Sequence, residues 1–179
     1  MIEYVIILSG DQICKQDYAD FLRFHKEKGA EFSVAVMEVD WKEASRFGLM
    51  VADENDKITE FQEKPPVPKS NLASMGIYIF NWDVLKKYLE EDEADPNSKN
   101  DFGMNIIPAL LRDGRKMYAY HFNGYWRDVG TIDSLWEATW KCWTPRTPAL
   151  ISFDKKWKIY SRQPRRCPPR RSGPRRHGA

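Results

Sequence analysis

Strand-like and helix-like segments alternate along most of this chain. Short runs rich in β-branched and aromatic residues, such as Tyr4–Leu8, 32–39 and 73–80, have the length of strands. Segments between them, including 15–29 and 83–92, carry apolar residues at helical spacing. This alternation predicts an α/β sandwich built on a mainly parallel, mixed sheet.

The remaining elements follow the same patterns. Further helices are expected over 42–47, 101–112 and 131–143, and further strands over 48–53, 57–64, 116–122 and 125–130. Thr131 is the expected N-cap of the last helix, and the proline-rich 65–71 is expected to be a loop. The first run, Tyr4–Leu8, is typical of a buried parallel strand that ends at Ser9-Gly10 and presents Asp11.

Charge divides the chain into two unequal parts. All 26 acidic residues precede Arg162, whereas seven of the 28 basic residues lie in 162–179 together with four prolines. We therefore expect a catalytic or binding domain over 1–146, a connector over 147–161, and a disordered Arg/Pro-rich tail over 162–179. The tail has no aromatic residue for stacking on bases, so nucleic acid is not an expected partner.

Composition favours a cytoplasmic protein with no membrane partner. No apolar run approaches the roughly 20 residues that a membrane span needs. The three cysteines, Cys14, Cys142 and Cys167, are widely spaced and suggest neither a disulfide framework nor a zinc site.

Three charged features stand at expected strand ends, where ligands of open α/β sheets bind. Asp11 could hold a divalent cation such as Mg²⁺, or it could be a turn or helix-cap residue. Glu63 and Lys64 could bind sugar hydroxyls and a phosphate, or they could form a solvated ion pair. Asp128 could be a second metal ligand, or it could cap the helix that follows.

Several other residues have weaker signals. Gly48 would let a ligand approach the backbone closely, and the Ser74 hydroxyl could donate to a phosphate or sugar oxygen, although a plain turn and a strand start also explain them. The three histidines do not cluster and are expected to be surface or hydrogen-bonded residues. Trp136, Trp140 and Trp143 share helical spacing, which is typical of core packing.

Six segments, taken in order, carry a resemblance to a known family. They are LSGDQICKQDY, EASRFGLM, ITEFQEKP, LASMGIYIF, NDFGMNIIPALL and GYWRDVGTIDSLWEA. Together they resemble the bacterial ADP-glucose pyrophosphorylases (glucose-1-phosphate adenylyltransferases) over about residues 3–161. Gln12 and Cys14 depart from the family pattern, which has His and Tyr there.

The resemblance implies a fold, a reaction and a set of roles. The fold would be a partial Rossmann-like nucleotidyltransferase sandwich, and the reaction would join ATP and glucose 1-phosphate to give ADP-glucose and pyrophosphate in glycogen or starch biosynthesis. Asp11 and Asp128 would be catalytic and hold Mg²⁺. The residues that would bind glucose 1-phosphate are Gly48, Glu63, Lys64 and Ser74. A homo-oligomer is the implied assembly.

The resemblance also implies an incomplete catalytic domain. The sequence has no glycine-rich phosphate loop, and the matching segments resemble the later part of the family's catalytic domain, without the β-helix domain that follows it. We therefore expect an inactive fragment, and two alternatives remain open. One is a non-catalytic remnant or regulatory partner of an intact homologue, and the other is a different sugar-nucleotidyltransferase.

Overall fold

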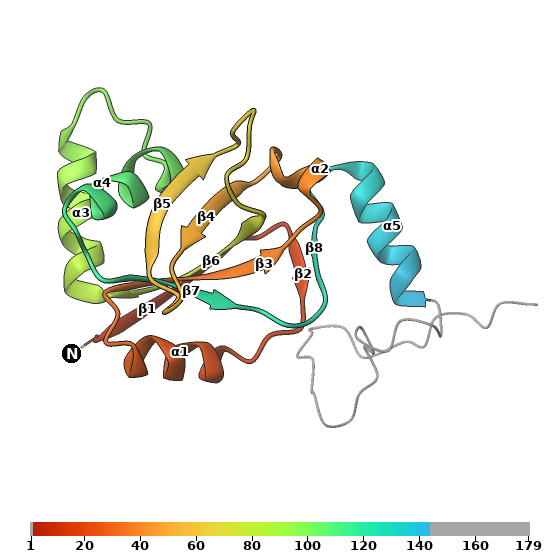
Figure 1. The fold of residues 1–179 in the computed structure, drawn as a ribbon, viewed down its shortest axis with the longest axis horizontal. Coiled ribbons are helices and arrows are strands. Elements are labelled where there is room, and N and C mark those ends of the chain that lie inside the picture. The colour runs from red at the N-terminus through yellow and green to blue at the C-terminus, as the bar shows by residue number, and fades with distance from the viewer. Residues whose placement is uncertain (1, 144–179) are drawn as a thin grey trace, which may run out of the picture.

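A computed structural model describes residues 2–143 as an α/β fold with one six-stranded sheet and one two-stranded sheet (Figure 1). The main sheet has the order β5-β4-β6-β3-β7, with β1 also paired to β6. Its strands are β1 (Tyr4–Leu8), β3 (Phe32–Glu38), β4 (Gly48–Ala52), β5 (Ile58–Glu63), β6 (Leu72–Asn81) and β7 (Met117–His121). The small sheet pairs β2 (Gln12–Cys14) with β8 (Trp126–Asp128).

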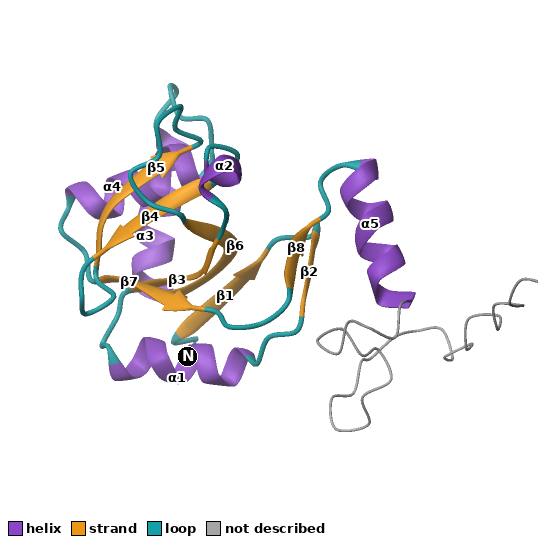
Figure 2. Ribbon diagram, turned by 45° about the vertical axis from the view of Figure 1, so that its right-hand side comes forward, coloured by secondary structure: helices purple, strands orange, loops and turns teal. Residues whose placement is uncertain are grey.

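Helices cover both faces of the main sheet (Figures 1 and 2). The helices are α1 (Tyr18–Glu27), α2 (Trp41–Ala44), α3 (Trp82–Ala94), the π-helix η1 (Phe102–Ile106), α4 (Ile107–Arg112) and α5 (Ile132–Trp143). α1 lies on one face and α3, η1 and α4 on the other, whereas α5 stands apart. One buried cluster joins alternate residues of β3 to α3, η1 and α4. A second cluster joins the opposite face of the sheet to α1 through Phe21. The α/β sandwich expected from the sequence is therefore confirmed.

The expectation of a mainly parallel sheet is wrong. Within residues 2–143, β3 and β7 form the one parallel pair, and the other pairings of the main sheet are antiparallel. The ten-residue β6 explains this, because it lies between β3 on one side and both β4 and β1 on the other. β4 and β5 form a hairpin with no crossover helix, so they run antiparallel, and β6 pairs antiparallel with the other side of β4.

The expectation of a buried parallel strand at the start of the chain is also wrong. β1 runs antiparallel to β6, with Ile6 opposite Ile79. Ile6 and Leu8 are 38% and 49% exposed. Val5 and Ile7 pack against the core on the other face of the strand. A continuous apolar run is therefore compatible with a strand that is buried on one face alone.

Polar side chains cap two of the helices, and one of them, Thr131, is the N-cap expected from the sequence. Asp17 caps α1, since its carboxylate accepts a hydrogen bond of 2.9 Å from the Ala19 amide. Thr131 caps α5, since its hydroxyl oxygen accepts from the Ser134 amide at 3.2 Å. Asp11 and Asp128 are thus not the residues that cap these two helices.

The tryptophan stripe on α5 is not core packing, contrary to its spacing. Trp136 and Trp140 are 64% and 46% exposed, and their rings stack on each other at 5.8 Å. Figure 2 shows α5 standing apart from the main sheet. The connector 147–161 and the tail 162–179 lie outside the described residues.

Candidate functional site

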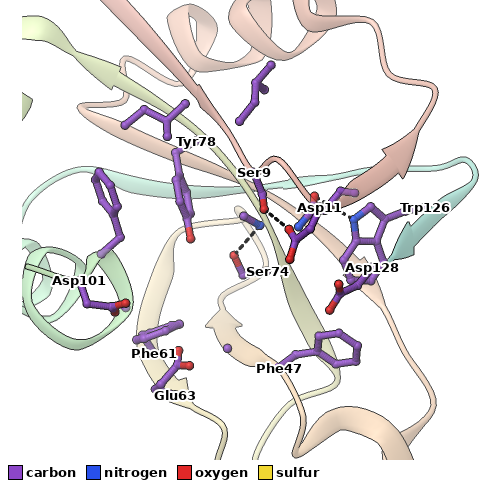
Figure 3. Close-up of a pocket in the computed structure, with 17 residues that line it drawn as sticks. Ser9, Asp11, Phe47, Phe61, Glu63, Ser74, Tyr78, Asp101, Trp126 and Asp128 are labelled. Carbon is purple, nitrogen blue, oxygen red and sulfur yellow. Dashed lines mark hydrogen bonds between the residues drawn. The ribbon is translucent and has the colours of Figure 1, made fainter. Parts of the chain in front are cut away.

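A cavity of about 410 Å³ opens where the two sheets meet, and it gathers most of the predicted site residues (Figure 3). It is lined by Ile7, Leu8, Ser9, Asp11, Gln12, Phe47, Gly48, Phe61, Glu63, Ser74, Gly76, Tyr78, Asp101, Phe102, Gly103, Trp126 and Asp128. Five of the six residues singled out from the sequence are in this set. Lys64 is the exception.

Asp11 and Asp128 lie at one end of the cavity because β2 and β8 pair antiparallel (Figure 3). The Val129 amide donates to the Asp11 carbonyl at 2.9 Å, which ties the two segments together beside the carboxylates. The Ser9 hydroxyl donates to Asp11 Oδ1, and the Gly130 amide donates to Asp128 Oδ1 at 2.9 Å. Both carboxylates are therefore held in fixed orientations.

Gly130 leaves a small space that both carboxylates border. A Cβ atom at position 130 would lie 3.2 Å from Asp128 Oδ1 and 3.6 Å from Asp11 Oδ2. The two oxygens are therefore no farther apart than the sum of these distances. Oxygen donors of this kind suit a hard divalent cation. Within the described residues, no group of three or more His, Cys, Asp or Glu side chains could hold a metal ion.

Glu63 and Asp101 lie at the other end of the cavity (Figure 3). Glu63 closes β5 directly opposite Gly48 of β4. Asp101 precedes η1, and its carboxylate accepts a hydrogen bond of 2.8 Å from the Met104 amide. Strand pairing therefore positions Glu63, and the hydrogen bond at the start of η1 positions Asp101.

Lys64 does not line the cavity. It follows β5 with a φ of 43°, and its amide donates to the Phe47 carbonyl at 3.2 Å. Its side chain is 66% exposed, and its Nζ atom lies 3.7 Å from Glu63 Oε1. The solvated ion pair considered from the sequence is present, and any contact of Lys64 with a ligand remains a prediction.

Tyr78 supplies a neutral hydroxyl between the acids. Burial raises the pKa of Tyr78, the bond to the Ser74 hydroxyl lowers it, and the nearby Glu63 and Asp101 charges raise it further. The phenol therefore stays protonated at neutral pH and can donate a hydrogen bond. Ser74 Oγ also accepts from the Gly76 amide at 3.2 Å.

Aromatic rings complete the walls. Tyr78 stacks on Phe102 at 5.6 Å, and Phe47 contacts Trp126 at the same ring separation. Trp126 Nε1 donates to Gln12 Oε1 at 3.1 Å, so Gln12 keeps a structural hydrogen bond at the position where the family pattern has a histidine. Apolar ring faces beside hydrogen-bonding groups are typical of ligand pockets that orient a polar molecule.

Sequence reasoning missed Tyr78, Asp101, Phe102 and Trp126 as lining residues. For Tyr78, its spacing from Ser74 along the chain could have indicated a place in the same site. Tyr78 is four residues beyond Ser74 on the same strand, and such residues point to the same face of a sheet. Asp101 is the first residue of the helix expected over 101–112, where capping is a sufficient explanation for an aspartate.

The charge of the cavity restricts its ligand. Four carboxylates line it, from Asp11, Glu63, Asp101 and Asp128, and no lysine or arginine is among its described lining residues. Hydroxyl groups can donate to such a surface, whereas a phosphate there needs a cation beside it. The fold and this cavity together define an α/β protein with an acidic pocket beside its main sheet.

Comparison with known proteins identifies the family within that class. A family model described as nucleotidyl transferase matches residues 2–143, and the chain belongs to the nucleotidyl transferase family.

Relatives named glucose-1-phosphate adenylyltransferase resemble the chain over most of its length. The protein of Clostridium acetobutylicum is 60% identical over 162 residues, which are 90% of this chain and 42% of the relative. The protein of Clostridium beijerinckii is 62% identical with the same coverage of both chains. The protein of Bacillus cereus is 54% identical over 93% of this chain and 44% of its own length. The chain thus spans about two fifths of the length of these relatives.

Between residues 2 and 143, no helix combines the length and the apolarity that crossing a bilayer requires.

Proposed function

We propose that this chain carries the sugar-phosphate half of a glucose-1-phosphate adenylyltransferase, an enzyme that makes ADP-glucose and pyrophosphate. One observation carries the proposal. Five residues that the family resemblance assigns to the site come from separate parts of the sequence and line one cavity. The names and the 54–62% identity of the relatives support the same conclusion.

The acids at one end of the cavity would bind the hexose. The carboxylates of Glu63 and Asp101 can each accept hydrogen bonds from sugar hydroxyls, and hydrogen bonds to charged groups are the stronger kind. The Tyr78 hydroxyl can donate to a ring or hydroxyl oxygen of the sugar. Such contacts would hold glucose at this end of the cavity, with its phosphate directed between the Lys64 ammonium beside Glu63 and the end formed by Asp11 and Asp128.

The reaction itself needs little covalent chemistry from the protein. A phosphate oxygen of glucose 1-phosphate attacks the α-phosphorus of ATP, a new O–P bond forms, and the bond to the β-phosphate oxygen breaks as pyrophosphate leaves. Positioning of the two phosphates and neutralisation of their charge supply most of the catalysis. Lys64, at the rim beside Glu63, is the cation of this site that we propose to bind the sugar phosphate.

Asp11 and Asp128 fit a magnesium ion. Their donor atoms are carboxylate oxygens, and the missing side chain of Gly130 leaves room beside both. A bound Mg²⁺ would neutralise charge on the reacting phosphates. The protein's part is to hold the two carboxylates in place through the Ser9 hydroxyl and the Gly130 amide.

Calorimetric titration of the 179-residue chain tests the sugar site. Glucose 1-phosphate should bind in the presence of Mg²⁺, and glucose 6-phosphate should bind more weakly because its phosphate cannot reach Asp11 and Asp128 while the hexose contacts Glu63. Glu63→Gln should reduce the affinity for glucose 1-phosphate. Folded chain that binds neither sugar phosphate would overturn the proposal.

The same family resemblance leads us to propose a cytoplasmic homo-oligomer acting in glycogen synthesis. None of the contacts described above selects a nucleobase. Pyrophosphate release with ATP, UTP and dTTP would separate an adenylyltransferase from other sugar-nucleotidyltransferases. Release from any nucleotide by the 179-residue chain would contradict the expectation of an inactive fragment, whereas glucose 1-phosphate binding without release fits both that fragment and a non-catalytic partner of an intact homologue.

A further inference from the structure

Gly103 is the second residue of η1, and its backbone does not explain why glycine stands there. Its φ lies outside the left-handed region, unlike Gly29, Gly76 and Gly114, whose φ values are 57°, 66° and 66°. Glycine is among the poorest helix formers. Such a conflict between local propensity and structure is expected at functional sites.

The space that a side chain at position 103 would fill is already occupied. A Cβ atom there would lie 2.8 Å from Glu63 Oε2, 3.4 Å from Glu63 Cδ and 3.3 Å from Asp101 Oδ1. The first distance is shorter than real Cβ contacts allow. Glycine at this position therefore permits two acids of the cavity to approach the start of η1 together.

Gly48 confines the same oxygen from the other side. A Cβ atom at position 48 would lie 3.0 Å from Glu63 Oε2 and 3.0 Å from Phe61 Cε2. Gly48 belongs to β4 and Gly103 to η1, so two independent elements each lack a side chain at one carboxylate oxygen. We call this arrangement the glycine slot, formed by Gly48 and Gly103 around Glu63 Oε2.

The slot leaves the Glu63 carboxylate with one defined orientation. Oε2 lies between the two glycines, and Oε1 lies 3.7 Å from the Lys64 ammonium. The Glu63 side chain is 31% exposed, so part of it still faces the cavity. A carboxylate held in this way presents its lone pairs to a ligand without first losing rotational freedom.

We propose that Gly103 is a positioning residue that sets the orientation of the Glu63 carboxylate for the sugar hydroxyls. This inference rests on the proposed function, since it concerns the same sugar pocket. Alanine at position 103 would push away the end of a flexible side chain, because the nearest atom is the Glu63 Oε2 tip. The fold would therefore tolerate alanine, which is also the better helix former, while the pocket would lose a correctly placed acceptor.

The test is calorimetric titration of the full 179-residue chain with glucose 1-phosphate, together with a thermal melt of each variant. Gly103→Ala should weaken binding roughly tenfold or more, the usual effect of losing a hydrogen bond to a charged group. Its melting temperature should not fall. Met104→Ala is the matched control, because Met104 follows in the same helix, is 53% exposed and does not line the cavity of about 410 Å³, so its affinity should be unchanged.

A double variant distinguishes an effect on the orientation of the Glu63 carboxylate from a general disturbance of the cavity. Glu63→Asp shortens the carboxylate so that it no longer reaches the slot, and it should weaken binding by itself. Adding Gly103→Ala to Glu63→Asp should then cost little more, because the two changes act through one oxygen.

Each outcome decides the proposal. Unchanged affinity of Gly103→Ala, a full additional loss in the double variant, or a clear drop in melting temperature would each overturn the positioning role. Failure of the unaltered chain to bind glucose 1-phosphate would remove the proposed function as well, so the two failures are distinguishable.

Discussion

At the residue scale, the cavity divides into an end that suits a cation and an end that suits a sugar. Asp11 and Asp128 share the space beside Gly130, whereas Glu63 and Asp101 share the space beside Gly103. These four acids would repel one another in an empty, dry site, so hydroxyl donors and a cation must offset their charge. Substitutions at the two ends are therefore expected to have different effects.

The cation end predicts that removing one carboxylate charge stops turnover without unfolding the protein. Asp11→Asn and Asp128→Asn would be placed in a chimera in which residues 3–161 replace the aligned part of the Clostridium acetobutylicum relative. Pyrophosphate release should fall on the order of a hundredfold or more, since charge neutralisation at a metal site contributes several kcal/mol. Asp20→Asn, an exposed residue paired with Arg23, is the control and should retain full activity. Undiminished Mg²⁺-dependent release from either site variant would reject the metal role.

The proposed contact between Lys64 and the sugar phosphate predicts that removing the ammonium weakens glucose 1-phosphate binding. Lys64→Ala should weaken glucose 1-phosphate binding by about 1.5–3 kcal/mol, the usual range for a hydrogen bond to a charged group. Lys69→Ala is the matched control, because Lys69 is 62% exposed and pairs with Glu60 outside the cavity lining. Equal affinities of the Lys64 variant and the unaltered chain in calorimetry would show that the exposed ammonium does not reach the ligand.

At the element scale, the positions of most helices and strands could be predicted from sequence, and their pairing could not. The patterns located β3, β6, α3 and α5 to within about three residues. The direction in which each strand pairs depends on which strands lie next to it in the sheet. The apolar residues of a strand do not show which strand will be its neighbour. The three-residue β2 was missed because it is too short for a period to appear. The Trp136 and Trp140 stripe was misassigned because helical spacing marks a face without showing what covers it.

The residues that line the cavity divide in the same way. Glu63 and Asp128 could be predicted because they end strands and belong to recognisable motifs. Tyr78 and Asp101 could not, because a strand tyrosine and a helix-cap aspartate each have an ordinary structural explanation. Their common cavity is a property of the folded chain, set by the position of β6 against η1.

A buried histidine joins three elements and predicts a dependence of stability on pH. His25 of α1 is fully buried, with Nδ1 at 2.8 Å from Ser33 Oγ of β3 and Nε2 at 3.0 Å from Asn81 Oδ1, which precedes α3. Burial lowers the pKa of His25, the Asn81 bond opposes this shift, and the Lys26 charge adds to it. The folded protein therefore keeps the ring neutral at a pH where the unfolded chain has begun to bind a proton.

The sign of the effect follows from this difference. The stabilising contribution is complete above the unfolded pKa of about 6.5 and is lost as pH falls from there through the lowered folded pKa. Urea unfolding at pH 8 and pH 5.5 should show a lower free energy of unfolding at the acidic pH, and His25→Gln should reduce that difference. His121→Gln is the control, since its side chain is 49% exposed. An identical pH dependence in the His25 variant would contradict this account.

At the scale of the whole molecule, β1 leaves one edge of the main sheet open. Among residues 2–143, β1 pairs with β6 alone. The Ser9 amide donates to the Gly76 carbonyl, and the Trp82 amide donates to the Glu3 carbonyl. Hydrogen-bonded pairs alternate along an antiparallel ladder. The backbone groups of Tyr4, Ile6 and Leu8 therefore point away from β6, and Ile6 and Leu8 are also among the exposed large apolar residues.

An open, apolar strand edge of this kind pairs readily with other chains. We therefore expect the 179-residue chain to self-associate as its concentration rises, and light scattering at increasing concentration measures this directly. Ile6→Lys places a charge at the centre of the edge and should reduce the scattering, because a charged side chain opposes edge-to-edge pairing. Val67→Lys adds the same charge at a loop residue that is 78% exposed, and it should change the scattering much less. If both lysine variants reduce scattering equally, net charge rather than the β1 edge controls association.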